Sequence, residues 1–261
     1  MLEYNRERRD WQDVVWERVD YVDTVASLYQ RIKGSEEFSS VPDVNNFVRL
    51  LQEQMAGKLV IENGLVMPNL PRGKLWHVTN ADRLPSILEK GLEPQAEDQY
   101  EPAGLKPVNL ESTDLMHEGE YTSLPCLFFA MHPNYAVFKK GRRGTSEEIL
   151  TLLEIDWPVL KSRGYKLFPV YPSDGYPINR LSPIPDLENA LEKGIHGNLE
   201  FGCYETLQPD PLVITGIFVD RRATRTQYPR FRVVEVDTTK GLSADASGKG
   251  WNRAVVEYYS K

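Results

Sequence analysis

His77 is the residue whose surroundings point most directly to chemistry. It lies two residues before Thr79 in the stretch 75–79, which is short, apolar and β-branched, as is typical of a strand. The helix predicted to follow would present free backbone N–H groups near this histidine, and a helix N-terminus favours anionic groups. The alternative is a core histidine beside Trp76 whose hydrogen bonds are satisfied within the protein.

A short helix is predicted directly after this strand. Pro85 has no N–H to donate, so it is tolerated only in the first turn of a helix. With Asp82 as the N-cap, Pro85 is the third helical residue and the carboxylate can accept hydrogen bonds from free amides. Apolar residues then recur at helical spacing and a glycine suited to the αL conformation ends the pattern, at Leu84, Ile87, Leu88 and Gly91.

The run WHVTNADRLPSILEKGLEP, residues 76–94, resembles the opening motif of ADP-ribosyltransferases, particularly the DarT family of DNA-modifying toxins. That motif is a His-x-Thr strand followed by a helix of the type Asn/Asp-x-Leu-x-Ser-Ile-Leu-x-x-Gly-Leu. The resemblance implies that His77 and Thr79 hold the nicotinamide ribose and amide of NAD, with Asn80 as a further contact. It covers roughly residues 74–94, with weaker similarity near 126–156 and 198–219 and none in the first 70 or so.

A second segment supplies the aromatic residue that such a site needs. Residues 124–130 and 149–155 are apolar strands, and 133–141 suits a helix between them. This order resembles the second part of the ADP-ribosyltransferase fold, where an aromatic of the first strand stacks on nicotinamide. Phe128 or Phe129 would be that aromatic, although alternation lets only one of them face a cleft and the other is expected in the core.

Three further residues in this segment are candidates for binding NAD. Tyr135 lies in the predicted helix, and Arg142 and Arg143 follow it in the run KKGRRG. The two arginines are weaker candidates, for the pyrophosphate.

Glu205 is the candidate catalytic carboxylate. A loop with three glycines precedes a strand predicted over 199–206. In ADP-ribosyltransferases the catalytic glutamate opens such a strand after a loop that contacts the acceptor, and the DarT family has a comparable glutamate before an apolar stretch like LQPDPLVI here. Glu200 is the rival carboxylate.

Together these residues match the needs of ADP-ribose transfer from NAD. Nicotinamide leaves a ribose that acquires oxocarbenium character, so the enzyme must hold the nicotinamide and stabilise a developing positive charge. One histidine, one aromatic and one glutamate suffice, without a metal. The resemblance assigns His77 and Thr79 to positioning NAD, and Glu205 to electrostatic stabilisation and deprotonation of the acceptor.

A local basic patch lies between two β-rich runs, 212–219 and 231–237. It contains four arginines and a tyrosine, with Arg232 just beyond: Arg221, Arg222, Arg225, Tyr228 and Arg230. Arginines suit the phosphates of a nucleic acid and the tyrosine suits base stacking. A solvated hairpin tip is the equally common alternative.

Composition limits the classes of protein that fit. The 261 residues carry a net charge of −7, which argues against a globally basic nucleic-acid binder, while 41% hydrophobic residues are enough for a core. Cys126 and Cys203 form no CxxC pair, so neither a zinc site nor a disulfide framework is indicated. A cytoplasmic protein is expected, or one delivered to a target cell without a Sec signal, because the charged N-terminus does not resemble a secretory signal.

The rest of the chain predicts an α+β fold. Amphipathic helices are expected over 11–29 and after 39–42, a hairpin over 58–67, a long loop over 93–124 and a last strand over 254–259. We therefore expect a split, mainly antiparallel sheet with flanking helices, as in ADP-ribosyltransferases. Residues 1–70 would form a helical extension packed on this core, and 71–261 the catalytic domain.

Two departures from the family patterns bear on the acceptor. Cys203 stands where arginine-modifying members have Gln or Glu, two residues before the catalytic glutamate, so protein arginine is disfavoured. Residues 93–124 contain no arginine, although DarT-type enzymes use one in the corresponding loop. The resemblance thus predicts a mono-ADP-ribosyltransferase toxin or effector, with a nucleic-acid acceptor favoured over protein and with an antitoxin or immunity partner conceivable.

Two alternatives stay open at this point. An NAD-dependent RNA 2′-phosphotransferase begins with a similar strand and helix but depends on an Arg-x-His pair, and His117 lacks the arginine. A catalytically silent binding module of the same fold would act through the arginine patch. The signatures GxxxxGK[ST], GxGxxG and GxSxG are absent.

Overall fold

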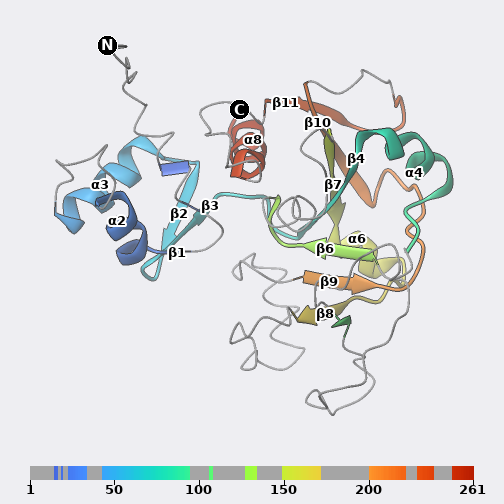
Figure 1. Cartoon of the computed structure of the whole chain (residues 1–261), viewed down its shortest axis with the longest axis horizontal. Coiled ribbons are helices and arrows are strands. Elements are labelled where there is room, and N and C mark those ends of the chain that lie inside the picture. Colours follow the sequence, from blue (N-terminus) through green and yellow to red (C-terminus); the bar gives the residue numbers. More distant parts are fainter. Residues whose placement is uncertain are drawn as a thin grey trace, which may run out of the picture. The chain divides into compact units, whose positions relative to one another are not determined.

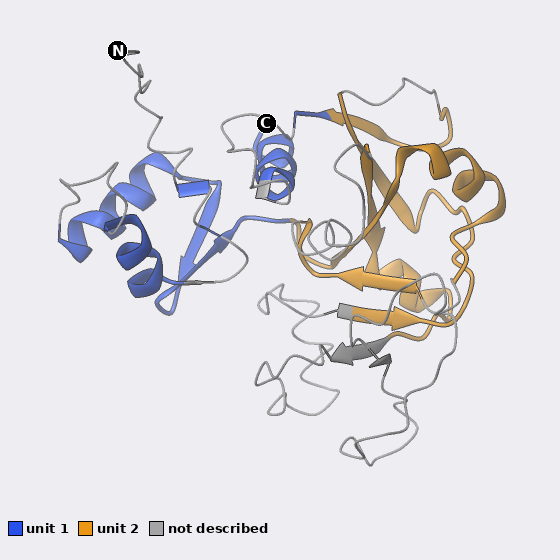
Figure 2. Cartoon of the chain, in the orientation of Figure 1, with its two compact units in different colours: residues 1–70, 236–261 blue, residues 71–235 orange. Residues whose placement is uncertain are grey.

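The computed structural model describes residues 15–16, 19, 23–33, 43–94, 106–107, 127–133, 149–171, 200–221, 228–237 and 249–261. Contacts divide the chain into two compact units, coloured separately in Figure 2. Unit 1 contains residues 1–70 and 236–261, and unit 2 contains residues 71–235. Residues 236–261, which we expected in the catalytic domain, are thus grouped with residues 1–70. The roles of the two parts, and the packing of residues 1–70 on a core, stay predictions.

Unit 1 combines helices with a small sheet. The helices are α2 (Val25–Lys33), α3 (Val44–Gln54) and α8 (Lys249–Tyr259), and the sheet has the order β1 (Asp23–Thr24), β3 (Leu65–Pro68), β2 (Leu59–Glu62). The expected hairpin is confirmed, because β2 and β3 pair antiparallel around Asn63 and Gly64, whose φ angles of 52° and 76° suit a tight hairpin turn. The expected second helix is α3, capped by the Asp43 side chain, which accepts from Asn45 N.

Two expectations for this unit were wrong. The single helix expected over 11–29 is interrupted, since Thr24 belongs to β1 and its hydroxyl accepts from Ser27 N at the start of α2. A threonine that caps a helix competes with helical backbone bonds at its own position, which helical spacing alone does not reveal. The strand expected over 254–259 is part of α8. The contiguous burial of Ala254, Val255 and Val256 shows that packing outweighs the β-propensity of the valines.

Unit 2 is built on an eight-stranded sheet (Figure 1). The strand order is β11-β10-β7-β4-β6-β9-β8-β5. The strands are β4 (Lys74–Asn80), β5 (Lys106–Pro107), β6 (Leu127–Ala130), β7 (Leu150–Asp156), β8 (Phe168–Tyr171), β9 (Glu200–Cys203), β10 (Ile214–Asp220) and β11 (Val233–Val236). Every pairing whose register is described is antiparallel, so the expected α+β fold with a mainly antiparallel sheet is confirmed.

The sheet is split between β4 and β6. β4 pairs with β7 along its whole length, from Lys74 with Asp156 to Asn80 with Leu150. On its other side, the described register joins β4 to β6 only through Trp76 and Ala130. The four residues of β6 pair instead with β9. The sheet therefore consists of two parts, β11-β10-β7-β4 and β6-β9-β8-β5, which the described register joins at one residue pair, in agreement with the expected split.

Two short helices belong to one face of this sheet. The helices α4 (Leu84–Lys90) and α6 (Trp157–Ser162) contribute Leu84, Ile87, Trp157 and Leu160 to the main core cluster. The sheet contributes alternate residues of its strands, including Leu75, Phe129, Leu153, Phe201 and Ile217. Asp156 caps α6 by accepting from Val159 N at 2.9 Å, so the end of β7 fixes the start of this helix.

The turn after β4 differs from our expectation. Ala81–Arg83 form a 3-10 turn, and α4 begins at Leu84 with Pro85 in its first turn. Asp82 lies inside the 3-10 turn and is not the N-cap of α4, whose cap residue Arg83 makes no side-chain cap bond. Gly91 ends the helix as expected, with φ at 102°. Its ψ of 168° is extended, however, so the residue is not in the αL conformation.

Candidate active site

The His77 side chain, on β4, is hydrogen-bonded to the main chain of the neighbouring strand β6. Its Nδ1 atom lies 2.8 Å from the backbone carbonyl oxygen of Phe128. A carbonyl oxygen can only accept, so the hydrogen-bond geometry assigns a proton to Nδ1, and Nε2 is the unprotonated nitrogen when the ring is neutral. The ring also packs edge-on against Phe129, with the centroids 5.9 Å apart. The half-buried imidazole is thus held in one orientation from the β6 side.

Thr79 and Asn80 end β4 beside this histidine. Thr79 is buried and pairs directly across the ladder with Thr151, whose buried hydroxyl has no hydrogen-bond partner among the described residues. Asn80 is half-buried, and its Oδ1 atom likewise has no partner in the described part of the chain. A buried polar atom without a partner is destabilising by about 1–3 kcal/mol. Thr79 lies on the same face of β4 as His77, whereas Asn80 lies on the opposite face, with Glu154.

The two candidate aromatics differ in burial. Phe129 is 1% exposed and belongs to the main core cluster, whereas Phe128 is half-buried and lies outside it. Alternation along β6 accounts for this difference. Part of the Phe128 surface is accessible to a ligand, but alternation turns its ring to the face opposite Phe129, whose ring contacts His77. Which of the two residues stacks on nicotinamide stays a prediction.

Glu205 follows the end of β9 and its side chain is exposed. It lies two residues after Cys203, the last residue of β9, which pairs with Leu127 of β6. The rival Glu200 opens β9, where its backbone pairs with Ala130 at the opposite end of β6. Glu200 therefore lies at the end of β6 where the described register joins it to β4, and Glu205 follows the other end. This arrangement favours Glu205.

The thiol of Cys203 lies in the core beside this glutamate. Burial raises the pKa of Cys203, and the nearby Glu205 carboxylate raises it further, against a backbone hydrogen bond to Glu205 that lowers it. The thiol Sγ lies 3.7 Å from the carbonyl oxygen of Glu205, to which it donates a weak hydrogen bond. Cys203 is therefore a protonated core residue rather than a reactive nucleophile.

The remaining candidates are only partly described. Tyr135, Arg142, Arg143, Arg222 and Arg225 lie outside the described residues. Arg221 and Arg230 are exposed, and Tyr228 is half-buried, packs against the main core cluster and accepts a backbone bond from Phe231 N. Because its ring contributes to the core, Tyr228 has less surface for base stacking than the sequence suggested. The role of the patch stays a prediction.

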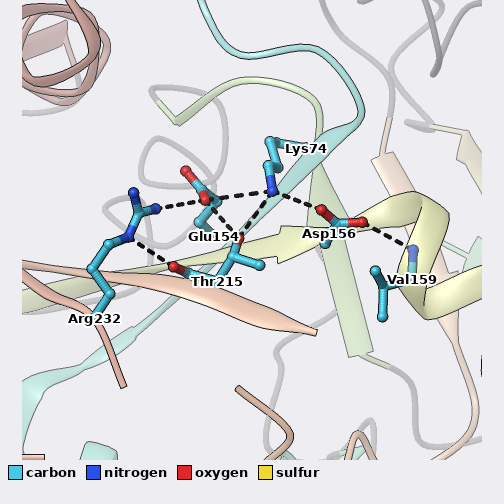
Figure 3. A network of polar contacts seen from close by, with 6 residues as sticks. All are labelled: Lys74, Glu154, Asp156, Val159, Thr215 and Arg232. Atoms are coloured by element: carbon cyan, nitrogen blue, oxygen red, sulfur yellow. Dashed lines mark hydrogen bonds and ion pairs between the residues drawn. The ribbon is translucent and has the colours of Figure 1, made fainter. Parts of the chain in front are cut away.

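A buried polar network, which sequence reasoning missed, lies on the other face of the sheet (Figure 3). Glu154 is fully buried, and its Oε1 atom accepts from the Thr215 hydroxyl at 2.6 Å and from Arg232 Nη2 at 2.8 Å. Lys74 Nζ donates to Thr215 Oγ1 at 3.1 Å and to Asp156 at 2.8 Å. The signal in the sequence was a carboxylate inside the apolar run LTLLEID, because a buried charge requires a partner.

This network is distinct from the site around His77. His77 pairs with Leu153, and neighbouring residues of a strand face opposite sides, so Glu154 faces away from His77. The network links residues of β4, β7 and β10 to the Arg232 side chain, which lies just after the arginine patch in the chain. Within the described ranges, no group of three or more His, Cys, Asp or Glu side chains could hold a metal ion, and no helix has the length and hydrophobicity to span a bilayer.

No family model matches the sequence, and no curated protein matches it. Among solved structures, the chain is similar to DarT of Thermus sp. 2.9 in complex with ADP-ribosylated ssDNA, with 14% identity, 64% of this chain and 95% of that chain covered and a TM-score of 0.37. The structure of the same protein in complex with NAD+ is 16% identical, with 64% of this chain and 96% of that chain covered and a TM-score of 0.35. Thermosipho africanus DarTG in complex with ADP-ribose is 16% identical, with 63% of this chain and 50% of that chain covered and a TM-score of 0.33. These identities are low, so function is inferred below from this chain's own residues.

Proposed function

We propose that this protein is an NAD-dependent mono-ADP-ribosyltransferase. The observation that carries the proposal is that the histidine, the aromatic pair and the glutamate come from three neighbouring strands, β4, β6 and β9. The His77 side chain is hydrogen-bonded from the first strand to the second, and Glu205 follows the third. These are the three residue types that the resemblance to ADP-ribosyltransferases requires.

The local chemistry fits NAD as the co-substrate. The half-exposed surface of Phe128 can stack on the nicotinamide ring. His77, whose ring is oriented by the bond from Nδ1 to Phe128, is the residue that the resemblance assigns to the nicotinamide ribose. A contact from Asn80 to NAD, which the resemblance implies, stays a prediction.

The proposed reaction transfers ADP-ribose to a nucleophilic acceptor. The bond between C1′ of the ribose and the nicotinamide nitrogen breaks, and nicotinamide leaves with the bonding electrons as a neutral molecule. The Glu205 carboxylate stabilises the positive charge that develops on the ribose and takes the proton that the acceptor loses when it bonds to C1′. An exposed carboxylate suits this role, because the acceptor must approach it from solvent.

We propose a nucleic acid as the acceptor class. Two exposed arginines, Arg221 and Arg230, lie in the connection between β10 and β11 and suit contacts with phosphates. Cys203 is in the core, so it cannot take the acceptor-recognition role of the Gln or Glu found two residues before the glutamate in arginine-modifying enzymes. A cytoplasmic toxin or effector role, with an antitoxin or immunity partner, completes the proposal.

The test is incubation of the wild type and of Glu205→Gln with labelled NAD and a panel of DNA, RNA and lysate protein, followed by digestion and mass spectrometry. The amide keeps the shape of the carboxylate but carries no charge and is not a base. We expect an ADP-ribose adduct on nucleic acid from the wild type alone. An adduct on protein would overturn the acceptor class. Intact NAD with no adduct on any acceptor would overturn the transferase assignment.

A further inference from the structure

The segment that carries Glu205 is tied to the helix that follows the His77 strand. Leu92 N donates to Leu207 O at 2.8 Å, and Leu207 N donates to Leu92 O at 2.9 Å, which forms an isolated antiparallel bridge. Gly91 makes this approach possible, because a Cβ atom there would lie 2.8 Å from Leu207 O. Its φ of 102° also favours glycine. The backbone two residues after Glu205 is thus fixed against the end of α4.

Tyr165 holds the same segment from another element. This tyrosine follows α6, and its half-buried ring packs against the main core cluster. Its hydroxyl accepts from Gln208 N at 3.1 Å and donates to Thr206 O at 3.4 Å. One hydroxyl therefore binds the main chain on both sides of Leu207. Phenylalanine at this position would keep the packing and lose both bonds.

The two anchors leave the Glu205 side chain exposed while its backbone is fixed. The main chain before it is the ladder of β9, and the thiol of Cys203 donates to the Glu205 carbonyl oxygen. The main chain after it is held by Leu92 and Tyr165. A carboxylate that stabilises developing charge must keep its distance to the reacting atom, and a displacement of about 1 Å can cost about 100-fold in rate.

We propose that Tyr165 is a positioning residue for Glu205, acting through the backbone of residues 206–208, with Gly91 as the second point of the same clamp. This inference rests on the proposed function, because it assigns Tyr165 a part in the reaction that Glu205 performs. Tyr165 touches neither substrate nor the reacting atoms. Its effect is therefore expected in kcat rather than in the KM for NAD.

The first test is Tyr165→Phe in the full chain. We expect kcat for ADP-ribose transfer to fall about tenfold, as loss of the order of one hydrogen bond implies, with the KM for NAD changed less than about twofold. The amide of Gln208 should exchange its proton with solvent faster. The matched control is Tyr29→Phe in unit 1, where the ring packs on Phe47 and no change in kcat is expected.

A second pair of variants addresses the other anchor. Gly91→Ala places a methyl group against Leu207 O, so the segment must shift, and kcat should fall by about tenfold or more. Gly57→Ala is the control, since Gly57 also has a positive φ, 71°, but a Cβ there would meet no atom within 4 Å. Both variants carry the strain of alanine at positive φ, and only Gly91→Ala should displace Glu205.

The outcomes separate this inference from the proposed function. If the wild type transfers ADP-ribose and Tyr165→Phe has the same kcat as Tyr29→Phe, Tyr165 has no positioning role and the inference is wrong, whatever the exchange rate of Gln208. If kcat and thermal stability fall together in equal measure for Gly91→Ala and Gly57→Ala, the clamp has only a structural role. If the wild type transfers nothing and Glu205→Gln behaves identically, the proposed function is lost and the inference with it.

Discussion

Arg232 and Glu154 form an ion pair of 2.8 Å in which the carboxylate side chain is 1% exposed and the guanidinium is 39% exposed. The guanidinium reaches the carboxylate over Gly216, where a Cβ atom would lie 2.7 Å from Nη2. Arg232→Gln removes the nearest cation from a buried carboxylate, with Lys74 farther away at 3.7 Å, so we expect a loss of about 2 kcal/mol in the free energy of unfolding. Urea unfolding measures it.

The control for this variant is Arg49→Gln. Arg49 pairs with Glu53 at 3.0 Å on a helix surface, with side chains 62% and 54% exposed, so its loss should cost less than about 0.5 kcal/mol. Gly216→Ala changes no charge and should destabilise unit 2 nearly as much as Arg232→Gln, because its methyl group displaces the guanidinium. Equal effects for Arg232→Gln and Arg49→Gln would show that the buried network contributes nothing.

The aromatic pair of β6 gives a prediction that separates packing from binding. Phe129→Ala removes a fully buried ring and should destabilise the protein by about 3–5 kcal/mol. Phe128→Ala should destabilise the protein much less than Phe129→Ala. It should raise the KM for NAD about tenfold, as expected from the loss of one stacking interaction. Thermal melting and NAD titration of both variants decide the matter. An unchanged KM in Phe128→Ala would exclude Phe128 as the stacking residue.

His77 has two nitrogens that can be tested separately. His77→Asn retains an N–H donor close to the position of Nδ1, so the bond to Phe128 and the stability should survive, whereas Nε2 is lost. We expect kcat/KM for NAD to fall by about 100-fold in His77→Asn and in His77→Ala. Only His77→Ala should also lose about 1 kcal/mol of stability. Retained activity in His77→Asn would show that only the Nδ1 bond matters.

The stability of the protein should depend on pH through His132. This side chain is buried, and burial lowers its pKa to about 4 from an ordinary value of 6.5. The unfolded chain therefore binds a proton at higher pH than the folded chain does, and unfolding is favoured as the pH falls. The contribution is fully present above pH 6.5 and is lost as the pH falls toward 4, by up to about 3 kcal/mol.

Thermal melting between about pH 7 and pH 4 measures this dependence in the wild type and in His132→Gln. The variant has no titrating imidazole, so its melting temperature should vary less over this window. The carboxylates of the chain titrate in both proteins, which makes the difference between the two curves the quantity of interest. Parallel curves would show that His132 is protonated equally easily in the folded and unfolded states.

A nucleic-acid acceptor should make transfer sensitive to salt through the arginine patch. Arg230 is exposed, so Arg230→Ala should leave stability unchanged and weaken acceptor binding. The slope of log K against log salt should fall by about 0.7–0.9 for each phosphate that the arginine neutralises in the wild type. Fluorescence anisotropy with a labelled single strand measures the slope. Arg49→Ala, at an exposed site in unit 1, is the control. An unchanged slope would remove Arg230 from the acceptor surface.

The local features of the site could be predicted from sequence where short-range physics decides them. The strand around His77, the proline in the first turn of α4 and the glycine after it follow from backbone chemistry, and all three are observed. The strands β6 and β7 likewise lie in the apolar runs 124–130 and 149–155, as the apolar patterning predicts. Alternation also predicted that one of Phe128 and Phe129 would be core, but it could not tell which.

The interactions between distant segments could not be predicted from the sequence. Glu154 and Arg232 are far apart in the chain, and the register shift of β10 between Ile214 and Gly216 places a glycine opposite Glu154, over which the guanidinium reaches the carboxylate. The clamp on Glu205 likewise depends on a contact between distant segments, because Tyr165, which follows α6, bonds to the main chain after β9. The first helix is interrupted where Thr24 caps α2 and β1 pairs with β3, and in 254–259 packing outweighs the β-propensity of the valines.

Among the described residues, one pair joins β4 to β6, and this weak junction bears on how the sheet can open. Each half of the sheet has its own ladder, so each can unfold and refold locally as a separate cooperative unit. Under the proposed function, His77 and the arginine patch belong to the part with β4 and β10, whereas Phe128 and Glu205 belong to the part with β6 and β9. Local opening at the junction of the two parts would therefore separate the proposed active-site residues without unfolding either part.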